Sequence, residues 1–318
     1  DRLQALKRVL DGTLYDDLPY QFHEERNGAG EYIPLRLRRP SVRYGLCRVV
    51  VEDSVALLFS AGHFPTIEAP EAALGRVLAD IFAEARLNEV MIDAALRGAV
   101  GSVALLFRVL GGRVFFSVLE SLYLNPVWRV DVPDELARVS ERYKVSGADL
   151  LAQGYEDVDP LGVYWFQRVW DAREEIWYLP CPVDDPAATP VKDEARSVVH
   201  GLGFVPVVWV RNLPGGEGVD GACTFRAAIE TNIEIDYQLS QAGRGLKYSS
   251  DPTLLIKEPA TSDSEIVKGA GNALVVSEKG DAKLLEIGGT AAEAVIAYVR
   301  TLREFALESV HGLSLIHI

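Results

Sequence analysis

The alternation of hydrophobic and polar positions over residues 203–258 predicts a strand, a loop, a long helix and a second strand. Residues 204–210 form a β-branched run that is typical of a strand, and residues 211–221 hold too many turn formers for a helix. Apolar residues then recur at helical spacing over residues 224–247, and no proline interrupts them. Residues 253–258 return to a strand pattern.

A second long helix is predicted over residues 290–310. Thr290 and Glu293 have the spacing of a capping box, and apolar residues follow along one helical face. Between the two long helices the pattern predicts three short strands and two turns: strands at 254–256, 273–276 and 283–287, and turns at 269–272 and 279–281.

The N-terminal part of the chain shows helical spacing and one clear hairpin signal. Three helices are predicted, at residues 3–10, 68–86 (with Pro70 in the first turn) and 88–98. Gly111 and Gly112 then predict a hairpin turn that leads into a strand at residues 114–119. Residues 44–59 suit a buried helix or a buried strand, because periodicity alone does not separate the two.

Short aromatic strands are predicted between Trp128 and Val210, at residues 141–145, 162–170 and 175–179. Strand alternation places four side chains on one face of the middle strand: Tyr164, Phe166, Arg168 and Trp170. An aromatic pocket for a sugar or a base is one interpretation. We favour a half-buried antiparallel sheet, which is the commoner reason for such a pattern.

Four arginines lie close together near the N-terminus: Arg36, Arg38, Arg39 and Arg43. They alternate with Leu35 and Leu37, so they could form a phosphate-binding strand. We favour an exposed strand edge, or an edge that contacts another subunit.

Composition bounds the class of protein. The 318 residues are 48% hydrophobic, enough for a sizeable core, and the elements above predict an α+β fold. A net charge of -14 argues against a protein that reads nucleic-acid sequence through a basic face.

The three cysteines (Cys47, Cys181 and Cys223) lack metal-ligand spacing, and we expect buried thiols. No segment predicts a membrane span or a secretory leader, and residues 313–318 resemble a translated sequencing adapter rather than native sequence.

No known catalytic motif is present. The sequence lacks a phosphate-binding loop, a His-Glu-x-x-His zinc motif and a nucleophile elbow, and no two of its five histidines have helical ligand spacing. The adjacent acids Asp184-Asp185 and Glu174-Glu175 could be paired carboxylates, but such pairs in loops are more often solvated. We therefore expect no enzymatic activity, no metal and no cofactor.

The order of elements over the last two thirds of the chain resembles the portal proteins of tailed bacteriophages. The resemblance lies in Val205-Pro206-Val207-Val208, then Arg211-Asn212 and a glycine loop, then a long helix, then Asp-Pro-Thr-Leu-Leu-Ile at 251–256. The helix carries Glu234-Ile235-Asp236 and Ser240.

This resemblance implies a domain order. Residues 1–223 would form the wing region of helices and antiparallel strands, residues 224–246 the first stem helix, residues 247–289 a small β-containing clip, and residues 290–312 the second stem helix. Residues 313–318 would be a non-native tail.

The resemblance also implies a function and partners. A portal protein forms a homo-oligomeric ring, expected here as a dodecamer, at one capsid vertex of the virion. It passes double-stranded DNA without sequence specificity during packaging and ejection, and it is made in the cytoplasm of the host bacterium. Its partners would be the terminase, the head-completion or adaptor proteins, and the capsid and scaffold proteins, with no membrane.

Two groups of site residues follow from the same comparison. The clip would present charged residues toward partners: Lys257, Glu258, Asp263, Glu265 and Lys268. On the first stem helix, we interpret four charged residues as inter-subunit or channel-wall groups: Glu230, Glu234, Asp236 and Arg244. Two alternatives stay open, namely an acidic hydrolase with an aromatic groove and a different head or tail component of a phage.

Overall fold

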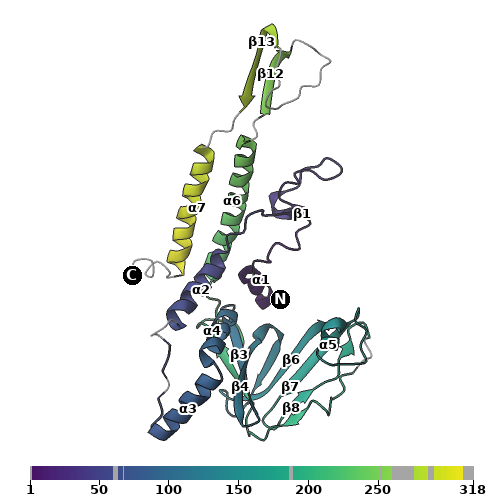
Figure 1. Ribbon diagram of the computed structural model, residues 1–318, viewed down its shortest axis with the longest axis vertical. Helices are drawn as coiled ribbons and strands as arrows, with labels where there is room; N and C mark the ends of the chain where they lie inside the picture. Colours follow the sequence, from purple (N-terminus) through teal and green to yellow (C-terminus); the bar gives the residue numbers. More distant parts are fainter. Residues whose placement is uncertain are drawn as a thin grey trace. The chain divides into compact units, whose positions relative to one another are not determined.

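The computed structural model describes residues 2–59, 64–66, 68–185, 189–250, 253–259, 276–285 and 290–310 (Figure 1). Within these residues the chain forms seven α-helices and several sheets that are mostly antiparallel. This confirms the α+β class.

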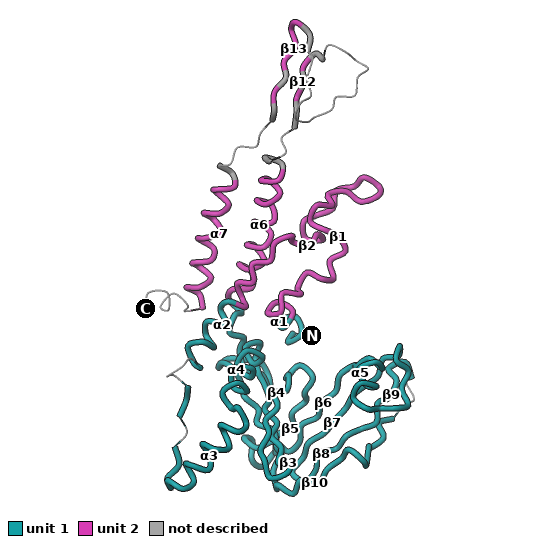
Figure 2. The backbone as a smooth tube through the Cα atoms, viewed as in Figure 1, with its two compact units in different colours: residues 1–7, 49–226 teal, residues 8–48, 227–318 magenta. Residues whose placement is uncertain are grey.

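The chain divides into two compact units (Figure 2). Unit 1 contains residues 1–7 and 49–226, and unit 2 contains residues 8–48 and 227–318. Residues 8–48, which the resemblance assigns to the wing, therefore belong to the same unit as the two long helices.

A three-stranded sheet in unit 1 is built around a tight hairpin. Strand β3 (Ser102–Leu110) pairs with β4 (Arg113–Glu120), and both Gly111 and Gly112 adopt positive φ, as the predicted hairpin requires. Strand β11 (Val207–Arg211) pairs with the other edge of β3. Pro206 lies just before β11, where its missing N–H costs the ladder nothing.

The larger sheet of unit 1 has the strand order β10-β8-β7-β6-β5, and β9 pairs with β7. Its strands are β5 (Leu124–Trp128), β6 (Leu136–Ser146), β7 (Val163–Trp170), β8 (Glu174–Trp177), β9 (Cys181–Pro182) and β10 (Val198–Val199). The short helix α5 (Gly147–Ala152) begins at Ser146, whose hydroxyl accepts a bond from the N–H of Asp149. Val139 and Trp170 of this sheet pack with Ala104 and Leu106 of β3, which forms one core for both sheets.

The helices of unit 1 occur in the predicted order, but some begin at other residues than predicted. Helix α3 spans Ala72–Glu84, so Pro70 lies outside it and its placement in the first turn was wrong. Arg86, the only non-glycine residue with positive φ among those described, separates α3 from α4 (Leu87–Gly98). Helix α1 spans Arg2–Leu10. Residues 44–59 resolve as a helix, α2 (Leu46–Phe59), whose length exceeds that of most strands.

Unit 2 contains the two longest helices. Helix α6 (Ile229–Ser250) follows a 3-10 turn at Arg226–Ala228, and it packs against α7 (Thr290–Ser309). Strands β12 (Thr253–Pro259) and β13 (Val276–Leu285) form an antiparallel pair, and they lie between the helices in the sequence. A small parallel pair, β1 (Tyr20–Gln21) with β2 (Arg38–Arg39), completes the unit.

The predicted turn at residues 279–281 was wrong. β13 continues through Gly280, and Asp281 pairs with Lys257 in the ladder. Pairing with β12 at Asp281 and again at Val276 keeps the segment within the strand, and the register shifts between these two pairs, next to the turn-forming Lys-Gly-Asp. Residues 269–275 and 286–287, which complete the other predicted elements of this module, lie outside the described residues.

One member of the arginine cluster, Arg38, differs from the expected exposed edge, whereas Arg36 and Arg43 are exposed. Arg38 is only 1% exposed, and its guanidinium donates to the carbonyl of Phe22 (3.2 Å) and to the hydroxyl of Tyr32 (3.1 Å). It also lies over both of these aromatic rings. Arg38 is therefore a core residue of unit 2, since aromatic rings and carbonyls replace the water around its charge.

Candidate interaction sites

Three polar residues at a spacing of four form a row along the buried side of α6. Asn232, Asp236 and Ser240 are all at most 5% exposed. They accept bonds from the backbone N–H groups of Cys47 (3.3 Å), Tyr44 (2.7 Å) and Val42 (3.0 Å), respectively. We name these three residues the polar row of α6.

The polar row supplies acceptors for backbone N–H groups of the segment that leads into α2. Cys47 lies in the first turn of α2, where a helix leaves its N–H groups free, and Asn232 supplies the missing acceptor. Asp236 also accepts bonds from the hydroxyl of Tyr15 (2.9 Å) and from the side-chain amide of Asn232 (3.1 Å). Burial raises the pKa of Asp236, and the donors from Tyr44 and Tyr15 oppose that rise.

The predicted role of Asp236 as a channel-wall or inter-subunit charge does not fit this environment. Its side chain is 1% exposed and its oxygens are occupied within unit 2. The sequence analysis did not foresee the polar row. The available signal was the spacing of Asn232, Asp236 and Ser240, which places all three on one helical face.

The other predicted residues of α6 lie elsewhere on the helix. Glu230 is exposed, and Glu234 accepts a bond from the amide of Gln238, one turn later (2.7 Å). Arg244 forms an ion pair with Glu25 and donates a hydrogen bond to its carboxylate. This hydrogen bond lowers the pKa of the Glu25 carboxyl. Of the four, Glu230 has the most accessible side chain.

The predicted clip residues fall partly outside the described chain. Lys257 is exposed on β12, and Glu258 lies on the same strand. Asp263, Glu265 and Lys268 lie outside the described residues.

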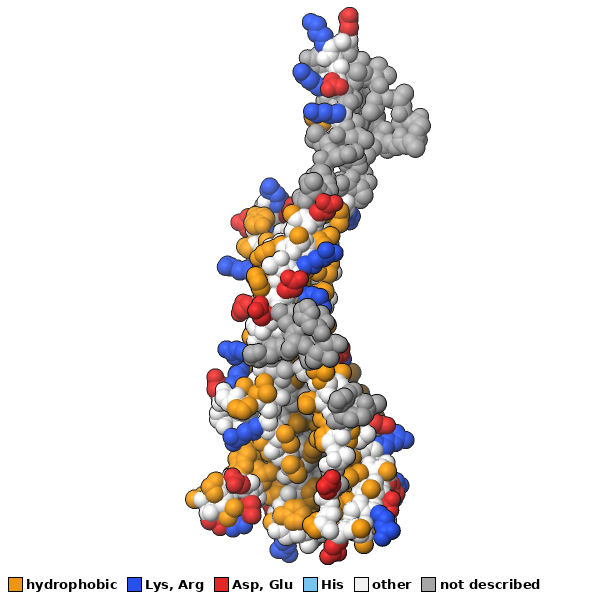
Figure 3. All heavy atoms as spheres, turned by 90° about the vertical axis from the view of Figure 1, so that its left-hand side faces the viewer, with side chains coloured by type: hydrophobic (Ala, Val, Ile, Leu, Met, Phe, Trp, Pro, Cys, Tyr) orange, Lys and Arg blue, Asp and Glu red, His pale blue; other side chains and the backbone are white. Residues whose placement is uncertain are grey.

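Helix α7 exposes large apolar side chains that the sequence analysis did not single out. Tyr298 is 46% exposed and Phe305 is 61% exposed, while Val299 and Ala306 on another side of the helix are buried. Tyr298 and Phe305 are seven residues apart, so they share one face. Figure 3 shows hydrophobic side chains between the charged ones on the helical part of unit 2. We name this pair the apolar face of α7.

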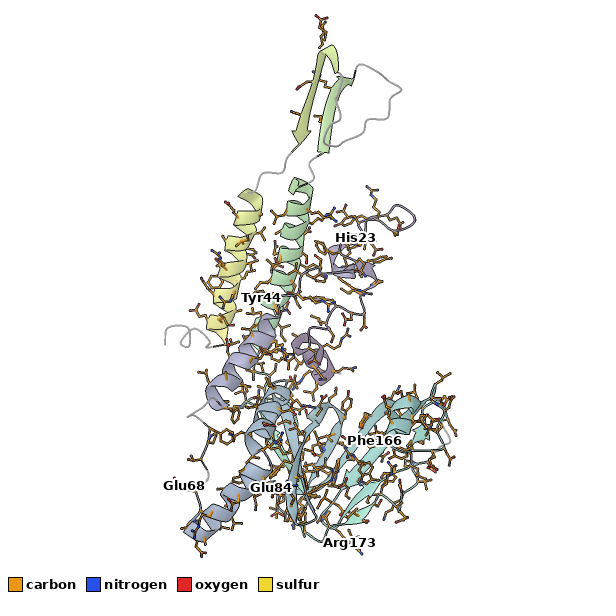
Figure 4. The ribbon with its side chains drawn as sticks, in the orientation of Figure 1. His23, Tyr44, Glu68, Glu84, Phe166 and Arg173 are labelled. Carbon is orange, nitrogen blue, oxygen red and sulfur yellow. The ribbon has the colours of Figure 1, made fainter. Side chains whose placement is uncertain are left out.

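The aromatic face of the larger sheet is a packed interior. Tyr164, Phe166 and Trp170 are buried, and Phe166, labelled in Figure 4, contacts the rings of Tyr143 and Trp177. Arg168 lies over the rings of three aromatic neighbours: Phe166, Trp170 and Trp177. The preferred interpretation, a half-buried sheet, fits this packing better than an open pocket does.

The carboxylates of this sheet are held in ion pairs. Glu141 accepts bonds from Arg168 (2.6 and 2.7 Å), and Glu175 accepts two bonds from Arg108 (2.6 and 2.9 Å). Glu141 and Glu175 are both buried. A hydrolase needs a carboxyl group that reaches its substrate. Glu141 and Glu175 are instead buried and ion-paired with arginines.

The structure shows neither a metal-binding cluster nor a membrane-crossing helix in the residues it describes. No group of three or more His, Cys, Asp or Glu residues converges within 2–59, 64–66, 68–185, 189–250 and the later described segments. No helix in the same segments is both long enough and apolar enough to cross a membrane.

No protein-family model matches the chain, and no curated protein matches it significantly.

Proposed function

We propose that this chain is the subunit of a portal ring. In this role it forms a homo-oligomer, expected as a dodecamer, at one vertex of a phage capsid. It conducts double-stranded DNA during packaging and ejection, and it docks the terminase and the head-completion proteins. The chain itself performs no chemistry.

One observation carries the proposal. Helices α6 and α7 are 22 and 20 residues long and pack against each other. The β12–β13 pair lies between them in the sequence. This is the order in which the portal resemblance places two stem helices and a clip. A helix pair repeated by every subunit can close a ring through heterologous contacts.

The apolar face of α7 supplies a surface for such contacts. Helix α7 already packs against α6 through one of its sides. Large apolar side chains that stay exposed on another side favour contact with a second protein. Phe305 is the most exposed large apolar residue described in unit 2 after Tyr32.

The test is native mass spectrometry of the chain, followed by negative-stain microscopy of the main species. A closed ring with a hole wide enough for a DNA duplex supports the proposal. A monomer or dimer over a wide range of protein and salt concentration overturns it, and so does an open sheet or filament.

A pair of variants sharpens this test. Tyr298→Glu with Phe305→Glu should dissociate the ring and leave the folded monomer intact, because both side chains are exposed in the single chain. The control is Glu304→Gln with Glu308→Gln, which changes exposed positions of the same helix and should preserve the ring.

A further inference from the structure

The outer face of strand β6 carries a row of positive charge in an acidic protein. Alternate residues of β6 point to the same side of the sheet, and on the outer side these are Arg138, Ser140, Arg142 and Lys144. The three cations are exposed, whereas Val139, Glu141 and Val145 of the same strand are buried on the inner side. The chain as a whole has a net charge of -14, so this row opposes its overall sign.

Trp165 of β7 organises the row. It pairs with Lys144 across the ladder, so the two side chains share the outer face. The guanidinium of Arg142 lies 4.1 Å from the centre of the Trp165 ring, and the ammonium of Lys144 lies 5.3 Å from it. Stacking on the ring limits the rotation of Arg142 and keeps its N–H groups available for an acceptor.

The three cations have no acidic partner in the described part of the chain. Several other arginines of unit 1 are paired: Arg108 of β3 with Glu175, Arg168 of β7 with Glu141, and Arg129 with Asp131 and Glu135. For Arg138, Arg142 and Lys144, no carboxylate of residues 2–59, 64–66, 68–185 or the later described segments lies within ion-pair distance. Their charge is available to another molecule.

The spacing of the row fits an extended chain. Arg142 and Lys144 are two residues apart on a strand, which separates them by about 7 Å, and Arg138 extends the row to about 20 Å. Alternate side chains of an extended peptide have the same repeat of about 7 Å. A segment with acids at every second position would therefore match the row.

A protein segment suits this surface better than a nucleic acid does. Two apolar side chains flank the row: Val127, which pairs with Arg138, is 38% exposed, and Val163, which pairs with Ser146, is 48% exposed. Single-stranded nucleic acids need several free aromatic faces for their bases, whereas Trp165 is the only aromatic residue of β6 and β7 on this side and Arg142 already lies over it.

We propose that the outer face of β6 and β7 binds an extended, carboxylate-rich segment of a protein partner. Arg142 forms a bidentate bond to one carboxylate, Lys144 and Arg138 bind others, and Val127 and Val163 contact the apolar parts of the segment. This surface belongs to unit 1, and the proposal does not depend on ring formation.

The test is fluorescence anisotropy with a labelled octapeptide of alternating glutamate and serine at low salt. The wild-type chain should bind it, and the peptide with glutamine in place of glutamate should not bind. The double variant Arg142→Gln with Lys144→Gln should weaken binding at least tenfold. Arg173→Gln is the matched control, because Arg173 is an exposed cation in the turn between β7 and β8 (Figure 4), and it should change binding less than twofold.

Three results would overturn the proposal. The glutamate peptide could fail to bind at low salt, the double variant could bind it as well as wild type does, or a single-stranded oligothymidylate could bind this face more tightly than the peptide. All the substituted side chains are exposed, so each variant should fold. A circular dichroism spectrum unchanged from that of the wild type checks this.

Discussion

Tyr15 donates a hydrogen bond of 2.9 Å to Asp236, although the two residues are 221 positions apart in the sequence. Both are buried in unit 2. Together with the polar row of α6, this bond holds residues 8–48 against the first long helix. The unit is therefore stabilised by polar contacts between its helical and non-helical parts, as well as by apolar packing.

Replacing Tyr15 with phenylalanine should lower the free energy of unfolding by about 1–3 kcal/mol. The variant keeps the ring but removes one donor to a buried carboxylate. Urea denaturation would measure the change. Tyr20→Phe is the control in the same unit, since the Tyr20 hydroxyl makes no hydrogen bond within the described residues. Equal effects of the two substitutions would show that the Tyr15 bond adds nothing.

The stability of the folded chain should depend on pH through Asp236. Burial raises the pKa of this carboxyl above its ordinary value of 3.8. The folded state therefore binds the proton at pH values where the unfolded state has lost it. The stabilising contribution of the protonated carboxyl is complete below pH 3.8, and it is lost as pH rises through the higher folded pKa.

The measurement compares wild type with Asp236→Asn, because the other titrating groups cancel in the difference. The free energy of unfolding of wild type, minus that of the variant, should fall as the pH is raised from about 4, with a slope no steeper than about 1.4 kcal/mol per pH unit. A difference that is constant or rises with pH would contradict the raised pKa.

Removing the acid of the buried ion pair in the larger sheet should destabilise the fold far more than removing the acid of an exposed ion pair. Glu141→Gln leaves Arg168 charged in the interior, where the two side chains are 8% and 13% exposed, and should cost about 3–5 kcal/mol. Asp131→Asn removes an exposed partner of Arg129 and should have little effect. Thermal unfolding of both variants would check this contrast, and a small loss in Glu141→Gln would mean that the aromatic rings alone satisfy Arg168.

Gly147 should not tolerate a side chain. A Cβ built at this position overlaps the carbonyl oxygen of Asp159, which is a backbone atom and cannot rotate away. We expect Gly147→Ala to lower the melting temperature. Gly75→Ala in α3 is the matched substitution: its Cβ would meet only Ala69, at 4.0 Å, and it should stabilise the helix by about 0.5–1 kcal/mol. A Gly147→Ala variant as stable as wild type would show that this loop shifts freely.

The sequence by itself determined the elements whose signals are local. Helices α6 and α7 follow from apolar spacing, and the β3–β4 hairpin follows from Gly111 and Gly112, because a helical face or a tight turn is encoded within a few neighbouring residues. The inner face of β7 was also predictable, since Tyr164, Phe166 and Trp170 alternate.

Only the tertiary structure decided the environments that depend on distant residues. Arg38 and Asp236 carry charges that a sequence reading places at the surface, and they are buried because Phe22, Tyr32, Tyr15 and Tyr44 supply partners. Gly280 lies inside β13 because this strand pairs with β12 on both sides of it, at Asp281 and at Val276. The cost of burying a charge, or of extending a turn-forming segment, is offset by contacts that no local pattern contains.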